Sequence, residues 1–206
     1  MKVLSQIILI LGGARSGKSS FAEKIAAELG GDDVVYLATA QALDEEMEDR
    51  IKHHQGQRPQ SWETIEEPIE VSKVIADLEE KKTVLMDCLT LFISNKILKN
   101  NKLEDEGSNL QEKFNIEKDI IKEIENIINA ARKKEINLII VSNEVGQGIV
   151  PNNELSRLFR DIAGRANQYT ADNADRVFMT IAGYPIDLKE VSVNQQKQFI
   201  KNLKED

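Results

Sequence analysis

The sequence has few of the features that mark secreted, membrane or nucleic-acid-binding proteins. It contains 1 cysteine, Cys88, which can form no internal disulfide and no cysteine-based metal site, so we expect a reduced, cytoplasmic protein. Lys and Arg number 27 against 35 Asp and Glu, a net charge of -8 that argues against a general nucleic-acid binder. The first apolar run, residues 7–11, is too short for a signal peptide or a membrane span.

What is present indicates a folded domain. Hydrophobic residues make up 41% of the chain and charged residues 30%, a balance typical of globular proteins and not of disordered ones. A length of 206 residues suits one domain with a sizeable core. We predict that residues 1–189 form this domain and that residues 190–206, rich in Asn, Gln and Lys, form a polar tail that is either a frayed helix or disordered.

Short apolar runs alternate with helical patterns along the chain. The runs rich in β-branched residues predict strands at residues 7–11, 34–38, 83–87, 138–141 and 176–181. Apolar residues spaced three or four apart predict helices at residues 19–29, 44–55, 68–80, 89–99, 110–134 and 152–171. Residues 100–109 are polar and predict a surface loop. This alternation predicts an α/β fold with a mostly parallel sheet covered by helices on both faces.

A phosphate-binding loop follows the first predicted strand. Residues 12–19 match G-x-x-x-x-G-K-[ST] at every fixed position, and a helical pattern follows directly. Backbone N–H groups and the start of that helix can therefore converge on a phosphate. We expect Lys18 to reach the β- and γ-phosphates and the Ser19 hydroxyl to join a Mg²⁺ shell. The predicted nucleotide-binding residues of the loop are Gly12, Gly13, Ala14, Arg15, Ser16, Gly17, Lys18 and Ser19.

A carboxylate stands at the end of the third predicted strand. Asp87 is suited to hold Mg²⁺ and to contact the nucleotide, directly or through water, although an Asp in this place can also cap the helix that follows. A phosphate-binding loop serves ATPases, GTPases, kinases and motor proteins alike. The reaction must therefore be inferred from other segments.

Both histidines of the chain are adjacent, His53 and His54. Neighbours on a helix point about 100° apart, and a metal pair needs the i, i+4 spacing, so we do not expect a metal site. Two interpretations stay open. The rings are either exposed at a helix end, or one neutral imidazole is a covalent nucleophile, which the polar residues around Arg58 favour because they could hold a nucleotide.

Two further polar segments follow the fourth predicted strand. Residues 142–151, which include Glu144, lie at the edge where α/β sheets bind ligands. In the next predicted helix, Arg157, Asp161 and Arg165 are four residues apart on one face. They form either a solvated ladder of salt bridges or a contact with a substrate phosphate, within one subunit or across a subunit interface.

Five segments together resemble one family. They are residues 12–19, 50–54 (RIKHH), 87–90 (DCLT), 143–151 (NEVGQGIVP) and 159–165 (FRDIAGR). The chain is similar over about residues 6–189 to the bifunctional adenosylcobinamide kinase / adenosylcobinamide-phosphate guanylyltransferase family of cobalamin biosynthesis. Several unrelated loops match at once, so the resemblance does not depend on the phosphate-binding loop alone.

The resemblance implies a RecA-like P-loop domain that assembles as a homotrimer. It implies phosphorylation of a corrinoid, adenosylcobinamide, by ATP or GTP, followed by transfer of GMP from GTP through a guanylyl-histidine at His54. Lys52 or Arg58 would help to neutralise phosphate charge in the nucleotide site. Glu144 is the catalytic base that its position suggests for the kinase step, with Asp87 or simple substrate positioning as alternatives.

Two other functions compete with this one. A P-loop kinase for another small alcohol would leave the histidines structural and form no covalent nucleotide. A motor-like RecA-type ATPase that assembles on a partner or on DNA would need an exposed basic groove, which the negative net charge disfavours. The bifunctional enzyme alone accounts for both the histidine segment and the loop after the fourth strand.

Overall fold

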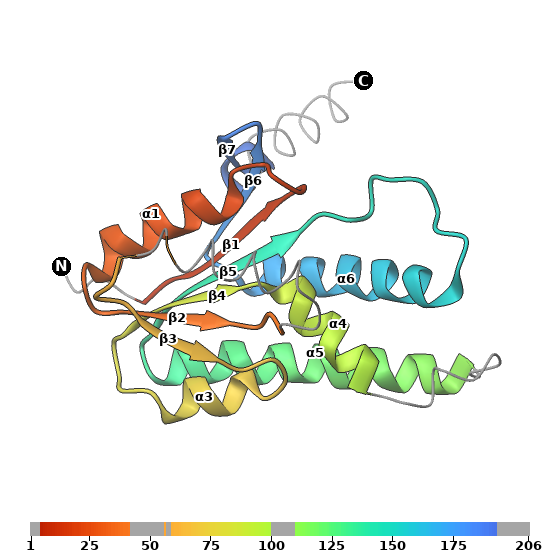
Figure 1. The fold of residues 1–206 in the computed structure, drawn as a ribbon, viewed down its shortest axis with the longest axis horizontal. Helices are drawn as coiled ribbons and strands as arrows, with labels where there is room; N and C mark the ends of the chain where they lie inside the picture. Colours follow the sequence, from red (N-terminus) through yellow and green to blue (C-terminus); the bar gives the residue numbers. More distant parts are fainter. Residues whose placement is uncertain (1–4, 42–55, 57–58, 100–109, 193–206) are drawn as a thin grey trace, which may run out of the picture.

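The computed structural model describes residues 5–41, 56, 59–99 and 110–192, and these form a single sheet flanked by helices (Figure 1). Its strands lie in the order β3-β2-β4-β5-β1-β6-β7, and all neighbours are parallel except β6 and β7. This arrangement confirms the predicted α/β fold with a mostly parallel sheet and a phosphate-binding loop after its first strand. The elements are β1 (Ile7–Gly12), α1 (Lys18–Gly30), β2 (Val34–Ala38), β3 (Glu63–Glu66), α3 (Val71–Asp77), β4 (Thr83–Asp87), α4 (Leu89–Lys99), α5 (Leu110–Lys133), β5 (Asn137–Asn143), α6 (Glu154–Asn173), β6 (Arg176–Ile181) and β7 (Tyr184–Asp187).

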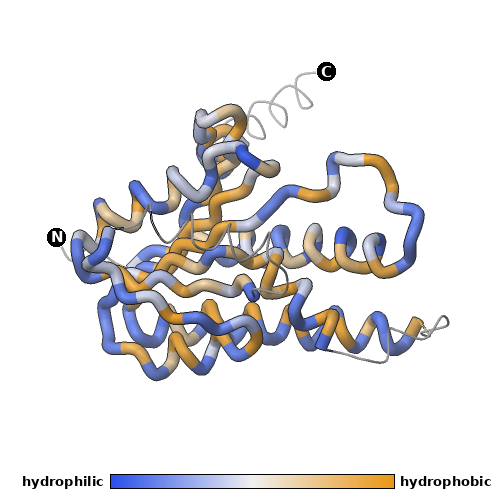
Figure 2. The backbone as a smooth tube through the Cα atoms, in the orientation of Figure 1, coloured by the Kyte–Doolittle hydropathy of each residue, from blue (hydrophilic) through white to orange (hydrophobic). Residues whose placement is uncertain are grey.

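The first strand lies in the middle of the sheet and is buried along its whole length. Ile8 and Ile10 pack with the buried face of α1, whereas Ile7 and Leu9 pack with α3, α4, α5 and α6 on the other side. α1 therefore covers one face of the sheet, and α3, α4, α5 and α6 cover the other (Figure 1), while Figure 2 shows the hydrophobic residues gathered along the central strands. Because helices cover both faces of the sheet, the sequences of its central strands are continuous apolar runs.

Five strands and five helices of the described chain confirm the predicted ones, with small differences in their bounds. The helix α3 is shorter than the predicted 68–80. Its start is delayed because the Glu67 carboxylate accepts hydrogen bonds from the N–H groups of Ile69 and Glu70, which shapes a turn before the first helical residue. The predicted helix at 44–55 and the predicted loop at 100–109 lie outside the described residues.

Two edge strands, β3 and β7, were not predicted. The sequence of β3 is ETIE, whose charged residues suit the exposed edge of a sheet but give no buried strand pattern. The second, β7, contains Pro185, which is compatible with an edge strand and weakens the strand signal. Both strands therefore depend on pairing with a neighbour that is already in place.

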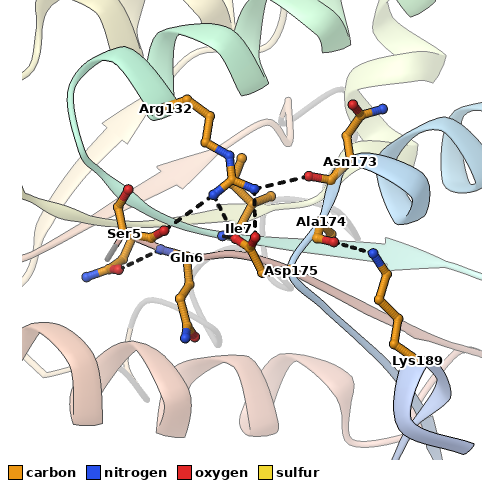
Figure 3. A network of polar contacts seen from close by, with 9 residues as sticks. Ser5, Gln6, Ile7, Arg132, Asn173, Ala174, Asp175 and Lys189 are labelled. Carbon is orange, nitrogen blue, oxygen red and sulfur yellow. Dashed lines mark hydrogen bonds and ion pairs between the residues drawn. The ribbon is translucent and has the colours of Figure 1, made fainter. Parts of the chain in front are cut away.

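The beginning of β1 is attached to α5 and to the turn before β6 (Figure 3). The Arg132 guanidinium donates to both carboxylate oxygens of Asp175, at 2.7 and 2.9 Å, and the Ile7 N–H donates to the same carboxylate at 2.7 Å. Arg132 also donates to the backbone oxygens of Ser5 and Asn173. This network lies at the end of the sheet opposite the phosphate-binding loop, so we assign it to stability. Within the part of the chain described, no helix is both long and apolar enough to cross a membrane.

Candidate active site

The phosphate-binding loop leaves β1 at Gly12 and enters α1 at Lys18. A Cβ on Gly12 would lie 2.3 Å from Ser16 Oγ and 2.8 Å from the Thr180 carbonyl oxygen, so only glycine fits there. Gly17, with φ of 91°, is the N-cap of α1 in the left-handed conformation that glycine adopts without strain. Two glycines of the motif are therefore required by the fold: Gly12 because a side chain would collide with its neighbours, and Gly17 because its backbone is left-handed.

The groups that would receive phosphate are the N–H groups and the lysine of this loop. The ammonium of Lys18 lies 3.4 Å from the Gly13 carbonyl oxygen, a long contact that a phosphate can readily replace. Two buried hydroxyls, Ser16 Oγ in the loop and Thr180 Oγ1 in β6, have no hydrogen-bond partner within the described part of the chain. Unpaired buried hydroxyls cost stability, and such a cost is characteristic of functional sites.

Asp87 is the last residue of β4, two strands away from the end of β1. Its Oδ2 accepts a 2.8 Å hydrogen bond from the hydroxyl of Tyr36, a buried residue of β2. Because the carboxyl ends of parallel strands meet at one edge, Asp87 and the phosphate-binding loop lie at the same edge of the sheet, outside which α/β proteins bind their ligands in a crevice. The alternative role of Asp87 as a helix cap gains no support, since its one described side-chain hydrogen bond is to Tyr36.

Glu144 directly follows β5, the strand between β1 and β4. Its N–H donates to the Gly12 carbonyl oxygen at 3.1 Å, which places it beside the start of the phosphate-binding loop. Its Oε1 accepts a 2.7 Å hydrogen bond from the N–H of Gly146. The carboxylate therefore shapes its own loop at this edge of the sheet, and its role as a base stays a prediction.

Buried hydrogen bonds connect the ends of β2 and β4. Thr39 Oγ1 accepts from the Cys88 N–H at 2.8 Å and donates to the Cys88 carbonyl oxygen at 2.7 Å. The Asn95 amide of α4 donates to the Thr39 carbonyl oxygen at 2.8 Å. These bonds fix the backbone immediately after Asp87, since Thr39 N–H also donates to the Asp87 carbonyl oxygen.

A second set connects the ends of β4 and β5 to α6. Asn143 Nδ2 donates to Thr90 Oγ1 at 2.8 Å, and Asn167 Nδ2 donates to the Asn143 carbonyl oxygen at 3.2 Å. Ser142 Oγ donates to Asn167 Oδ1 at 2.6 Å. Hydrogen bonds between such partly buried side chains rigidify their surroundings, so this set helps to fix the segments that carry Asp87 and Glu144. Thr90 and Asn143 belong to segments that resemble the family, whereas Ser142 and Asn167 lie outside them. The sequence predicted no role for any of the four side chains, because tertiary pairing has no sequence signature.

The thiol of Cys88 lies within this network. Burial, together with the negative charge of Asp87, raises the pKa of Cys88 to about 11, although the charge of Lys18 acts in the opposite direction. The sulfur lies 3.1 Å from Thr90 Oγ1. Cys88 is therefore a protonated, structural residue.

The donor set suits a magnesium ion that arrives with the nucleotide. Among the described residues, no group of three or more His, Cys, Asp or Glu side chains could hold a metal by itself. Mg²⁺ is usually bound through one or two carboxylates and substrate phosphates, with water completing its shell. The predicted ligands, the Ser19 hydroxyl at the start of α1 and the Asp87 carboxylate at the end of β4, are oxygen donors of the kind that such a site uses, and their role stays a prediction.

The charged face of α6 is attached to its neighbours. Arg165 forms a 2.6 Å ion pair with Glu117 of α5, and Arg157 donates to the carbonyl oxygens of Pro151 and Asn152 at 2.9 and 2.6 Å. Asp161 pairs with Arg160 at 2.9 Å. Between the starts of α5 and α6 lies an open groove of about 370 Å³, lined in part by Lys113, Phe114 and Arg157. These contacts join the charged face of α6 to α5 and to the loop that precedes α6. The alternative, a contact of this face with a substrate phosphate, stays a prediction.

The structure brings the eight loop residues, Asp87 and Glu144 to one edge of the sheet. The remaining predicted site residues, Lys52, His54 and Arg58, lie outside the described residues. Their roles therefore rest on the sequence. The turn between β6 and β7, which contacts the phosphate-binding loop through Gly183, was not predicted as part of the site, because only pairing in the sheet brings it there.

Comparison with known proteins gives a consistent result. A family model described as "Cobinamide kinase / cobinamide phosphate guanyltransferase" matches residues 8–188. The chain is 38% identical over 184 residues to "Bifunctional adenosylcobalamin biosynthesis protein CobU" of Escherichia coli (strain K12), covering 89% of this chain and 99% of that protein. It is 40% identical over 187 residues to the protein of the same name from Salmonella typhimurium, with coverage of 89% and 99%.

A third relative is "Bifunctional adenosylcobalamin biosynthesis protein CobP" of Pseudomonas aeruginosa, 41% identical over 182 residues, covering 88% of this chain and 96% of that protein. Among solved structures, the flagellar accessory protein FlaH from Methanocaldococcus jannaschii matches with a TM-score of 0.45 and 14% identity, covering 90% of this chain and 78% of that chain.

Proposed function

The chain belongs to the cobinamide kinase / cobinamide phosphate guanyltransferase family, and we infer from this that it carries out both reactions. It phosphorylates the hydroxyl of adenosylcobinamide and then transfers GMP from GTP to the resulting phosphate, giving adenosyl-GDP-cobinamide. The observation that carries this conclusion is the family match over residues 8–188, which spans the phosphate-binding loop, Asp87 and the loop after β5.

The geometry of the crevice supports the kinase step. Phosphoryl transfer needs positioning and charge stabilisation more than covalent chemistry from the protein. The N–H groups of the loop and the ammonium of Lys18 would hold the phosphates of ATP or GTP at the start of α1. Glu144, which lies against the loop beside Gly12, would accept the proton of the attacking hydroxyl. Bound at Ser19 and Asp87, Mg²⁺ would offset the negative charge of the phosphates.

The second step is proposed to proceed through His54. A neutral imidazole attacks the α-phosphate of GTP, a nitrogen–phosphorus bond forms, and the bond to the leaving pyrophosphate breaks. The phosphate of the corrinoid then attacks the same phosphorus and releases the histidine. Lys52 and Arg58, close to His54 in the sequence, would offset the charge of the phosphates. Only the neutral ring is a nucleophile, so acidic pH should suppress this step as the histidine becomes protonated. The reference pKa of a histidine side chain is about 6.5.

Three further features complete the proposal. Assembly as a homotrimer rests on the family resemblance. A cytoplasmic location rests on the single reduced cysteine and on the biosynthetic role of the relatives. The domain is proposed to end near residue 189, since the family match ends at residue 188.

The experiment that tests the function separates the two reactions. Purified protein is given adenosylcobinamide with ATP, and in a second assay adenosylcobinamide phosphate with GTP, and the products are resolved by chromatography. We expect both products from the natural protein, loss of the first with Lys18→Ala, and loss of the second with His54→Ala while its kinase activity is retained. Phosphorylation of other small alcohols but not of adenosylcobinamide would instead support a kinase with a different substrate.

A further inference from the structure

The sheet order defines two sides of the phosphate-binding loop. On one side of β1 lie β5 and β4, which end in the loop of Glu144 and in Asp87. On the other side lie β6 and β7. The transferred γ-phosphate must face the acceptor and the groups that assist transfer, so it points toward β5 and β4. The nucleoside at the opposite end of the triphosphate must therefore extend over β6 and β7 (Figure 1).

The turn between β6 and β7 lies directly against the phosphate-binding loop. The N–H of Gly183 donates to the Ser16 carbonyl oxygen at 2.8 Å. A Cβ placed on Gly17 would lie only 3.1 Å from the Cα of Gly183. The turn is therefore close enough to contact a nucleotide whose phosphates are held by the loop.

The conformation of this turn is strictly defined. Ala182 and Gly183 have φ values of 51° and 86°, and they connect the paired residues Ile181 and Tyr184. Two positive φ values in a two-residue hairpin are typical of a type I′ turn. The left-handed conformation is unfavourable for Ala182, and such strain is retained mainly where the surroundings or a ligand require it. A rigid turn also fixes the residue that follows it.

That residue is Tyr184, whose side chain is 78% exposed. Its partner across the hairpin, Ile181, is 55% exposed, and directly paired residues lie on the same face of a strand pair. An exposed aromatic ring with an apolar neighbour, held beside a phosphate-binding loop on its nucleoside side, suits a nucleobase. Stacking on an aromatic ring tolerates any base, because every base has a flat π face.

We propose that Tyr184 is the platform on which the purine base of the nucleoside triphosphate stacks while its phosphates occupy the loop at residues 12–19. The proposal rests on nucleotide binding by that loop, and it adds a base-binding site formed by the turn between β6 and β7. Since stacking does not read the hydrogen-bonding edge of a base, the kinase step accepts both ATP and GTP.

The experiment compares nucleotides with a ligand that lacks the base. Binding of ATP, GTP and inorganic tripolyphosphate, each with Mg²⁺, is measured by titration calorimetry for the natural protein, Tyr184→Ala and Tyr184→Phe. We expect Tyr184→Ala to weaken the binding of ATP and of GTP about tenfold, in line with the loss of one base–aromatic stack. Tripolyphosphate should bind this variant as it binds the natural protein, and Tyr184→Phe should restore nucleotide binding.

Ile186→Ala is the matched control, because Ile186 lies two residues along the same edge strand and is 44% exposed. It should leave all three affinities unchanged. If Tyr184→Ala weakened the binding of tripolyphosphate as much as that of ATP, the loop itself would be disturbed. If the variant bound ATP with unchanged affinity, the base would lie elsewhere. Either result overturns the proposal. A loss of assembly in sedimentation with unchanged affinities would assign Tyr184 to a subunit contact and also overturn it.

These outcomes are distinct from failure of the proposed function. Failure of the natural protein to bind tripolyphosphate would refute nucleotide binding by the loop. Normal ATP binding without phosphorylation of adenosylcobinamide would leave the proposed base site standing and would refute only the proposed substrate.

Discussion

The phenol of Tyr36 donates a 2.8 Å hydrogen bond to Oδ2 of Asp87, and thereby connects two neighbouring strands at the edge of the crevice. Tyr36 is 3% exposed, so its position is fixed by the core. One oxygen of the carboxylate is thus held by a rigid donor. The orientation of the proposed magnesium ligand is set from within the sheet and not by the ion.

Tyr36→Phe tests this relationship. The variant keeps the ring and removes the donor, so we expect it to fold with about 1 kcal/mol less stability and to need more Mg²⁺ for half-maximal kinase rate. The measurement is the kinase rate as a function of Mg²⁺ concentration, with Asp87→Asn for comparison, which should lose most activity at any Mg²⁺ concentration. An unchanged Mg²⁺ dependence in Tyr36→Phe would show that Asp87 is not oriented in this way.

Gly12→Ala should abolish nucleotide binding while leaving the remainder of the fold intact. The added methyl group would lie 2.3 Å from Ser16 Oγ and 2.8 Å from a backbone oxygen, so the loop must move. Gly164→Ala is the control, because a Cβ on this glycine within α6 meets nothing within 4 Å and alanine favours a helix by up to about 1 kcal/mol. Binding of ATP and thermal unfolding are measured for both. A Gly12→Ala protein that binds ATP normally would contradict the steric argument.

Asp175→Asn should destabilise the protein at neutral pH by on the order of 1 kcal/mol, since it weakens a partly exposed ion pair with Arg132. Burial alone would raise the pKa of Asp175, but the hydrogen bonds from Arg132 and the Ile7 N–H and the charge of Arg132 outweigh it and lower the pKa below 3.8. A lowered pKa in the folded state gives stability that is present above the unfolded value and is lost as the pH falls through the folded value.

The difference in stability between the natural protein and Asp175→Asn should therefore be constant from pH 6 to 8, where Asp175 is ionised in both the folded and the unfolded protein. It should shrink below about pH 4, as the carboxylate becomes protonated. Urea unfolding across this range measures it. Asp172→Asn, an exposed position in the last turn of α6, the helix that precedes Asp175, is the control and should change little at any pH. A difference at pH 3 as large as that at pH 7 would contradict the assignment.

Cys88 should not react with thiol reagents in the native protein. It is 5% exposed, and burial with the nearby charge of Asp87 raises its pKa to about 11, so the reactive thiolate is scarce at pH 8. Alkylation followed by mass measurement should show no modification of the folded protein and complete modification in urea. Rapid labelling of the folded protein would show that the segment after Asp87 opens readily.

The central fold was predictable because its signals are local. The buried run at residues 7–11, the glycine and lysine pattern that follows it and the spacing of α5 are each visible within a short window. The edge strands β3 and β7 were missed because charge in one and proline in the other suit strands that pair on one side only.

The site was predictable to the extent that a motif defines it. The loop residues, Asp87 and Glu144 lie together as expected, since they follow strands that end at one edge. The hydrogen bonds of Asn143, Thr90 and Asn167 join residues as much as 53 positions apart and give no periodic pattern. The contact between Gly183 and the phosphate-binding loop depends likewise on the sheet being assembled.

The central claim is that one chain is both a kinase and a guanylyltransferase that works through His54. The most direct measurement is the intact mass of the protein after incubation with GTP and Mg²⁺ without corrinoid, beside His54→Ala and His53→Ala. The account predicts an acid-labile gain of one GMP residue in the natural protein and in His53→Ala, and none in His54→Ala. Folded, GTP-binding protein that gains no mass, or that gains it equally in His54→Ala, would contradict the account.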